Sequence, residues 1–341
     1  MTAARHVGVV VLEWNGLADT VECLDSLHAA TPRPAVVVVV DNGSREGSAA
    51  GIRAWAARTG TALEEIAGDA PLPPDSRAWL VLVRLPENRG FAGGNNVGLR
   101  LLHRRPELTH FLLLNNDATV APDYFAALER ALRAAPDAGL LSGTIYDHAE
   151  RAKVWYAGGV SVPRRALVLH REVRPASDAP APTAFVTGCA LVVSRPALEA
   201  LGLLPECYFP AYVEDAEYSL RARAAGLRVL YAPEPTVYHK LGASAGRSDA
   251  SPFVAYLLAR HRPFYVRRNL RGLTRAAAIA YLLATKPARA AVELLRGRPA
   301  MARAVLVGTL SGLLSPDARR ETPPLARQER STATLPAGRS G

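Results

Sequence analysis

Blocks of apolar residues and blocks of helical periodicity alternate along the first 135 residues. Runs rich in valine and leucine, too β-branched to favour a helix, predict strands at residues 7–12, 35–40, 81–85 and 111–114. Apolar residues at helical spacing predict helices at residues 17–30, 48–58, 96–103 and 122–134. Strands that are apolar throughout are buried on both faces. The order therefore predicts an α/β fold whose mainly parallel, Rossmann-like sheet is flanked by helices.

The pattern changes after residue 250. Residues 254–314 are rich in Ala, Leu and Arg and predict helices, with breaks near residues 286–287 and 298–299 where prolines occur. The chain after Ser315 is polar and is expected to be disordered. We therefore expect three parts: an α/β domain at residues 1–250, a basic helical extension at 251–316 and a tail at 317–341.

Charge is concentrated in the last third of the chain. Residues 241–341 hold 17 Lys and Arg against five Asp and Glu. Such a segment suits an anionic membrane, nucleic acid or a phosphorylated substrate, and it is equally typical of a solvated Arg-rich surface. Six arginines crowd one stretch before an apolar segment at 276–284, and such a segment suits a helix that lies on an anionic membrane surface: Arg260, Arg262, Arg267, Arg268, Arg271 and Arg275. The alternative is an extension that packs on the α/β domain or mediates oligomerisation.

Cysteines and hydropathy indicate the compartment. Cys23, Cys189 and Cys207 form no CxxC or Cys/His cluster, so neither a disulfide framework nor a zinc site is expected. The apolar start of the chain fits a strand better than a signal peptide, and no run of about 18 uncharged apolar residues predicts a membrane span. These features favour a reducing cytoplasm.

Two predicted strands end in acids. Residues 36–40 lead into Asp41, and residues 111–114 lead into Asn115, Asn116 and Asp117. Ligands of open parallel sheets bind beyond the carboxyl ends of the strands, so paired acids there predict a polar ligand with a metal. Asp-Asn-Gly is also common turn chemistry, and Asp41 alone would mean little.

A glycine-rich segment at residues 88–98 lies between a predicted strand and a predicted helix. Glycines there let backbone amides approach a phosphate or sugar, and a helix N-terminus favours anions. The Rossmann fingerprint GxGxxG is absent, and ordinary turns use the same residues.

Two further acids precede a predicted helix that ends at Gly226. Glu214 and Asp215 would lie at the N-terminus of this helix, where an ionised carboxylate can accept a proton from a hydroxyl nucleophile. A simple N-cap is the alternative reading. His239 follows an apolar segment and can supply a second ligand to a metal held by one aspartate.

In this order the signatures resemble the inverting family 2 glycosyltransferases with the GT-A fold, above all their rhamnosyltransferase-like branch. The resemblance covers roughly residues 6–245. Its signatures are Trp-Asn-Gly at 14–16, Asp-Asn-x-Ser at 41–44, the segment 88–98, Leu-Asn-Asn-Asp at 114–117, Thr-Gly-Cys at 187–189, Tyr-x-Glu-Asp at 212–215 and His239.

The resemblance implies a role for each matching residue. Asp215 would be the general base, with Glu214 shaping its environment. Asp117 and His239 would bind the divalent metal, Mg²⁺ or Mn²⁺. Asp41 would contact the nucleotide base, and the other donor-binding residues would be Asn15, Asn88, Gly90, Gly93, Gly94, Asn95 and Asn116. The sequence departs from the family at Glu13, where Asn is usual, and at Glu217, where Asp is usual. Its metal motif, Asn-Asn-Asp at 115–117, also contains only one strong anionic ligand.

The implied activity is transfer of a sugar from a nucleotide sugar, with dTDP-rhamnose the commonest donor of the branch, to a glycan or lipid-linked hydroxyl. Inversion and a role in cell-surface polysaccharide synthesis are part of this expectation. We expect a cytoplasmic protein, peripheral to the inner face of the membrane and without a nucleic-acid partner. The alternatives are a sugar nucleotidyltransferase, which would need a basic glycine-rich loop after the first strand, and an inactive glycan-binding relative.

Overall fold

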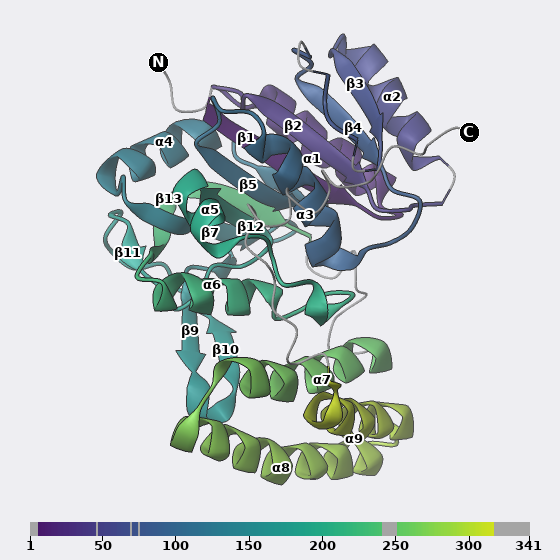
Figure 1. Ribbon diagram of the computed structural model, residues 1–341, viewed down its shortest axis with the longest axis vertical. Helices are drawn as coiled ribbons and strands as arrows, with labels where there is room; N and C mark the ends of the chain where they lie inside the picture. The colour runs from purple at the N-terminus through teal and green to yellow at the C-terminus, as the bar shows by residue number, and fades with distance from the viewer. Residues whose placement is uncertain (1–5, 46, 69, 74–75, 241–250, 317–341) are drawn as a thin grey trace, which may run out of the picture.

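The computed structural model describes residues 6–45, 47–68, 70–73, 76–240 and 251–316. Within them, eleven strands form one sheet in the order β11-β13-β7-β12-β5-β1-β2-β4-β3, with β6 paired to β13 and β8 to β7 (Figure 1). The bounds on one half are β1 (Val7–Glu13), β2 (Val36–Asp41), β3 (Leu63–Ala67), β4 (Leu80–Arg84) and β5 (His110–Asn115). On the other half they are β6 (Ala118–Val120), β7 (Ala138–Asp147), β8 (Val154–Tyr156), β11 (Ala181–Pro182), β12 (Ala190–Ser194) and β13 (Arg228–His239).

The predicted parallel core is confirmed. Strand β1 pairs in parallel with β2 and β5, and β4 pairs in parallel with β2 and β3. The register places Glu13 opposite Asp41 and Leu12 opposite Asn115. The polar residues that follow these strands therefore meet at one edge of the sheet, as the sequence predicted.

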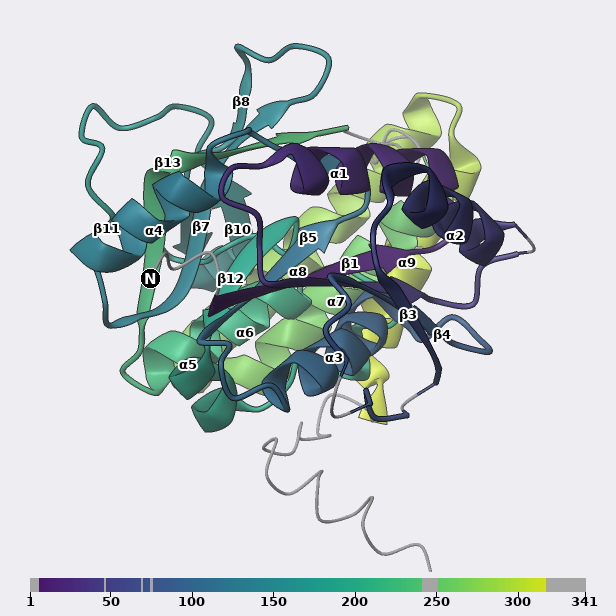
Figure 2. The same cartoon turned by 90° about the horizontal axis from the view of Figure 1, so that it is seen from above.

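Helices cover both faces of the sheet. One face carries α1 (Leu17–Ala29), α2 (Ser48–Thr59) and α4 (Tyr124–Ala134), and the other carries α3 (Gly90–His103), α5 (Arg195–Leu201) and α6 (Glu214–Ala224) (Figure 2). Strand β2 shows why: Val37 and Val39 join one core, while Val36, Val38 and Val40 join the other.

Helix α3 begins at Gly90, six residues earlier than predicted, so the expected loop at residues 88–98 is mostly helix. Tertiary contacts explain the glycines. A Cβ at Gly94 would lie 2.3 Å from Leu12, and one at Gly98 would lie 2.5 Å from Val10. Glycine lets α3 lie directly on β1, and this close contact outweighs its poor helix propensity.

The strands of the second half were largely missed. The ten-residue β7 was not predicted, nor was the separate hairpin of β9 (Gly159–Val162) and β10 (Leu167–His170). The hairpin turn is a short 3₁₀ helix, η2 (Pro163–Arg165), and the hairpin reaches from the sheet toward the C-terminal helices (Figure 1).

The C-terminal region is helical, as predicted. Its helices are α7 (Pro252–Asn269), α8 (Gly272–Leu295) and α9 (Pro299–Leu314). The break expected near residues 286–287 is wrong, because α8 continues through Pro287; the chain breaks instead between α7 and α8. The break before Pro299 is confirmed. In the described part of the chain, no helix combines the length and apolarity needed to cross a membrane. The predicted tail lies outside the described residues.

Candidate active site

At the edge where the parallel strands end, Glu13 is a fully buried carboxylate with many partners. It accepts hydrogen bonds from Gly16 N at 2.9 Å, Ser48 Oγ at 2.8 Å, Asn116 Nδ2 at 3.1 Å and the Thr20 hydroxyl. This network fixes the turn after β1 against α1 and α2. The departure from the family pattern at Glu13 is therefore compensated by donors that surround it.

The predicted donor residues gather beside this network. Asn15, at φ 56°, accepts from Arg45 N, while Asp41 accepts from Ser44 N at 2.9 Å. Asn88 Oδ1 accepts from Gly90 N at 2.7 Å. The sequence analysis missed Asn42, whose amide donates to both Asn88 and the carbonyl of Gly90, joining β2 to the start of α3.

Four predicted donor residues are occupied with contacts inside the fold. Gly93 and Gly94 are buried in α3, and the Asn95 amide donates to Phe91 O at 2.9 Å. The Asn116 amide donates to Glu13 and Thr20. These four residues stabilise the local structure of the site. Contact of any of them with a donor stays a prediction.

Asp117 and His239 meet at the same edge, as predicted for a metal site. Asp117 lies between β5 and β6, and His239 ends β13, opposite Ala118 of β6. Both side chains are buried, and His239 Nε2 lies 3.1 Å from Asp117 Oδ1. The antiparallel pairing of β6 with β13 thus brings together two residues that are 122 positions apart.

This pair fits a divalent cation. Two donor atoms about 3 Å apart can share one coordination sphere, and the other ring nitrogen of His239 is buried without a hydrogen-bond partner. No cluster of three or more His, Cys, Asp or Glu suited to a metal occurs in the described residues. The remaining ligands would therefore have to come from a bound diphosphate and water.

In the absence of a metal, the pair carries a proton. Burial alone would lower the pKa of His239, but Cys189 and Asp117 beside the ring raise it to about 10. The imidazolium of His239 thus places a positive charge next to Asp117. A metal ion bound here would have to displace the proton of His239.

The second predicted centre lies at the N-terminus of α6. The chain enters this helix through Tyr212 and Val213, both at positive φ (83° and 81°), a conformation costly for a β-branched residue. Asp215 Oδ2 accepts from Gly188 N at 2.9 Å, and Oδ1 accepts from Ala216 N at 2.7 Å. The carboxylate is therefore held in one orientation by the segment before β12, and it stays partly exposed.

Glu214 and Asp215 share the cost of burial. Burial and then the charge of Asp215 raise the pKa of Glu214 to about 8, and Glu214 Oε2 has no hydrogen-bond partner. Burial also raises the pKa of Asp215, although the N–H groups of Gly188 and Ala216 oppose this. The two neighbouring acids therefore disfavour a second negative charge, and the N–H groups of Gly188 and Ala216 favour placing the charge on Asp215.

Two residues that the sequence analysis missed connect the centres. The Trp155 ring of β8 lies 4.8 Å from His239 and 4.4 Å from the ring of His170 in β10. Burial lowers the pKa of His170, and the charge of Asp215 partly offsets this. Burial raises the pKa of the Cys189 thiol, and the charges of Asp117 and Asp215 also raise it, while His239 opposes them. Gly188, which donates to Asp215, directly precedes Cys189, and Cys189 interacts electrostatically with His239 and Asp117, so the two centres lie near each other.

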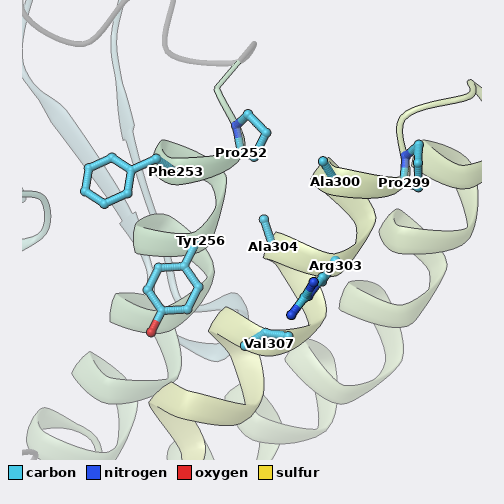
Figure 3. A pocket seen from close by; sticks show the side chains of 8 residues that line it. All are labelled: Pro252, Phe253, Tyr256, Pro299, Ala300, Arg303, Ala304 and Val307. Carbon is cyan, nitrogen blue, oxygen red and sulfur yellow. The ribbon is translucent and has the colours of Figure 1, made fainter.

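A cavity of about 540 Å³ lies elsewhere, between the N-terminal turns of α7 and α9 (Figure 3). Its walls are mostly apolar, with Phe253 and Tyr256 on one side and Val307 on the other, and Arg303 is its charged group. None of the predicted site residues lines it.

Comparisons with known proteins match most of this chain. A model described as Glycosyl transferase family 2 matches residues 9–202, and one described as Glycosyl transferase family group 2 matches residues 110–307. An N-acetylglucosaminyl-diphospho-decaprenol L-rhamnosyltransferase of Mycobacterium tuberculosis is 26% identical over 257 residues, which are 71% of this chain and 77% of that protein.

Solved structures share the fold. A mannosyltransferase of Pyrobaculum calidifontis, solved with GDP-Man and Mn²⁺, matches with a TM-score of 0.53 and 18% identity over 91% of this chain and 88% of that one. GalNAc-T7, solved with UDP, GalNAc and Mn²⁺, matches with a TM-score of 0.53 and 16% identity over 77% of this chain and 50% of that one. The predicted GT-A type fold with its helical extension is confirmed.

Proposed function

The chain belongs to glycosyl transferase family 2 and is a glycosyltransferase, and from this premise we propose that it transfers a sugar from a nucleotide-diphosphate donor with inversion. The observation that carries the proposal is the contact between Asp117 and His239, with Asp215 nearby through Gly188 and the adjacent Cys189. A cation-binding pair and a proton acceptor close to each other are what an in-line displacement requires.

The donor side of the proposal lies at the ends of β1, β2 and β5. Asp41 would contact the nucleotide base, with Asn15, Asn88 and Gly90 beside it. Asn42 holds Asn88 and the start of α3 in place for this role. Gly93, Gly94, Asn95 and Asn116 would act by supporting this surface, since their side-chain positions face the interior of the fold.

Asp117 and His239 would hold Mg²⁺ or Mn²⁺ against the donor diphosphate. When bound, the metal would neutralise the charge that develops on the leaving diphosphate. The chain's own contribution is to hold Asp117 and His239 3.1 Å apart on a rigid strand pair. The Mn²⁺ in the two solved structures named above supports this assignment.

Asp215 would act as the general base. The acceptor hydroxyl oxygen attacks the anomeric carbon, its proton moves to Asp215, and the bond to the diphosphate oxygen breaks with its electron pair. The two backbone N–H groups on Asp215 orient it and favour its ionised form, and the raised pKa of Glu214 favours a neutral neighbour. One displacement with the base opposite the leaving group inverts the anomeric centre.

Similarity to the mycobacterial rhamnosyltransferase supports rhamnose from a dTDP donor and a lipid-linked acceptor in cell-surface polysaccharide synthesis. Such an acceptor would place the enzyme at the cytoplasmic face of the membrane. No observation favours a sugar nucleotidyltransferase, since Trp14, Asn15 and Gly16 after β1 are followed by no basic glycine-rich loop.

A donor panel tests the proposed activity. The purified protein with Mn²⁺ is incubated with dTDP-rhamnose, UDP-GlcNAc, UDP-galactose and GDP-mannose, with and without a diphospholipid-linked acceptor. We expect one of the donors to release its nucleotide diphosphate, and only when acceptor is present. NMR of the anomeric proton should show that the product has the configuration opposite to that of the donor. A product with retained configuration, or no transfer from any donor, contradicts the proposal.

A further inference from the structure

The outer face of α8 is apolar along its whole length, and α8 forms the end of the molecule farthest from the sheet (Figure 1). Leu273, Leu283, Leu294 and Leu295 are exposed on it, two of them to 89%. Six exposed alanines and Pro287 fill the positions between them at helical spacing. A surface helix of a globular protein normally has the opposite pattern, with its polar side outward.

The charged residues of α8 are directed elsewhere. Glu293 is buried and bonded to Arg298 at 2.6 Å, with Arg289 at 3.3 Å. Lys286 is only partly exposed. Arg275 is exposed, but it lies on the same side of the helix as the buried residues Ala278 and Leu282. The apolar face therefore runs along a helix of about 36 Å without a charged side chain at its centre.

Three of the six arginines that first indicated a membrane segment have other partners. Arg262 donates to the carbonyls of Ala166 and Arg165, Arg267 donates to Gly312 and Ser315, and Arg268 binds Glu217 of α6. They join the helices to one another and to the sheet domain. The surface indicated by the structure is therefore the outer face of α8, and the Arg-rich part of α7 is not that surface.

Positive charge borders this face. Arg271, Arg275, Arg296 and Arg298 are exposed on α8 or beside its ends, and Arg164 and Arg165 are exposed on η2, which contacts α8. Residues 251–316 contain eleven Lys and Arg and one acid, the buried Glu293. A basic border around an apolar strip is complementary to anionic headgroups above an acyl layer.

We infer that the outer face of α8 is a docking surface for an anionic lipid bilayer, with α8 lying in the plane of the headgroups. A second copy of the chain fits less well, because a symmetric contact would bring two basic borders together. The inference goes beyond the proposed function, since it would hold for any soluble or lipid-linked acceptor.

The surface is also connected to the candidate site. The β9–β10 hairpin contacts α8 through η2 and carries His170, next to Trp155, at the far end of β10. Four residues of strand span about 13 Å. A bilayer against α8 would therefore lie on the side of the molecule that the hairpin links, through His170 and Trp155, to His239.

Vesicle sedimentation tests the inference with the full chain and no donor. We expect binding to phosphatidylglycerol-containing vesicles at low salt, weaker binding at high salt, and little binding to pure phosphatidylcholine. The double variant L273S/L295S should bind at least about tenfold more weakly, since it removes two fully exposed apolar side chains. The matched control V173S removes a side chain that is 78% exposed in the α/β domain and should bind like wild type.

Three results overturn the inference. The first is equal binding by L273S/L295S and wild type. The second is no wild-type binding to anionic vesicles at low salt. The third is a wild-type dimer, measured by light scattering, that is absent in L273S/L295S, together with no binding of wild type to vesicles. That result would make a second copy of the chain the occupant of this face. Because all three readouts omit donor and acceptor, failure here leaves the proposed sugar transfer to be judged separately.

Discussion

Two buried glutamates, one in each half of the candidate site, differ in what surrounds them. Glu13, at the end of β1, accepts from four donors, which lie in the turn after β1, on α1, on α2 and in the turn after β5. Glu214, at the start of α6, has an oxygen without any partner and a pKa raised by burial and by Asp215 to about 8. A buried carboxylate that is fully bonded holds the fold together, whereas one with an unpartnered oxygen beside a second acid shapes the charge of that acid.

The same contrast applies to the aspartates. Asp117 is fixed by two paired strands beside His239, while Asp215 is approached through two residues at positive φ. Rigid strands suit a metal pair that must keep its spacing. The positive φ angles before α6 make the position of Asp215 depend on the segments that pack around it, which suits a base that those segments must orient.

The largest expected effect is on the base. Asp215→Asn removes the proton acceptor but keeps the side-chain size and one hydrogen-bond acceptor, so transfer should fall by about 10³-fold or more with donor affinity unchanged. Steady-state rates together with nucleotide-sugar calorimetry check this. Asp137→Asn, the same change at a 62% exposed side chain before β7, is the control and should transfer like wild type. Full transfer by Asp215→Asn would remove Asp215 from the mechanism.

The next effect is on stability at Glu13. Glu13→Ala leaves buried donors on Ser48, Thr20 and Asn116 unpaired, so unfolding should become easier by about 3 kcal/mol. Urea unfolding followed by circular dichroism measures this. A loss below about 0.5 kcal/mol would show that the network is not structural and would end the contrast with Glu214.

Glu214 should respond to pH instead. Its folded pKa of about 8 lies above the ordinary value of 4.5, so stability is present below pH 4.5 and is lost as pH rises through 8. Glu214→Gln should therefore change little at pH 4.5 and gain at least about 1.4 kcal/mol at pH 9, the equivalent of one pKa unit. Urea unfolding at both pH values tests the sign. Destabilisation by the variant at pH 9 would mean that the ionised glutamate has a partner.

The smallest effect concerns the aromatic link. Trp155→Phe shortens the ring that lies between His239 and His170 while keeping it apolar. We expect a few-fold rise in the KM for the donor with kcat nearly unchanged, because the ring positions His239 and does not transfer a proton. A large loss of kcat would instead place Trp155 against the reacting atoms.

The sequence predicted the regions where local pattern and tertiary structure agree. The valine-rich runs of β1 and β2 could only be buried strands, and parallel pairing then placed Asp41 and Asp117 at one edge. Glycine obscured the start of α3, because its contact with β1 cannot be read locally. Trp155 and His170 belong to strands without a motif, and they reach the site only through long-range pairing.

The C-terminal helices show the same limit in another form. The density of arginines in α7 was visible in the sequence, but their carbonyl and carboxylate partners were not. The apolar outer face of α8 became recognisable only when the structure showed which side of the helix is buried.

Manganese binding measured by electron paramagnetic resonance, with nucleotide diphosphate present, tests the central claim most directly. The claim is that Asp117 and His239 form the cation site and Asp215 does not. We predict that wild type and Asp215→Asn bind Mn²⁺ with similar affinity, and that Asp117→Asn and His239→Ala each bind at least about tenfold more weakly. Wild-type affinity in both Asp117→Asn and His239→Ala would contradict the account.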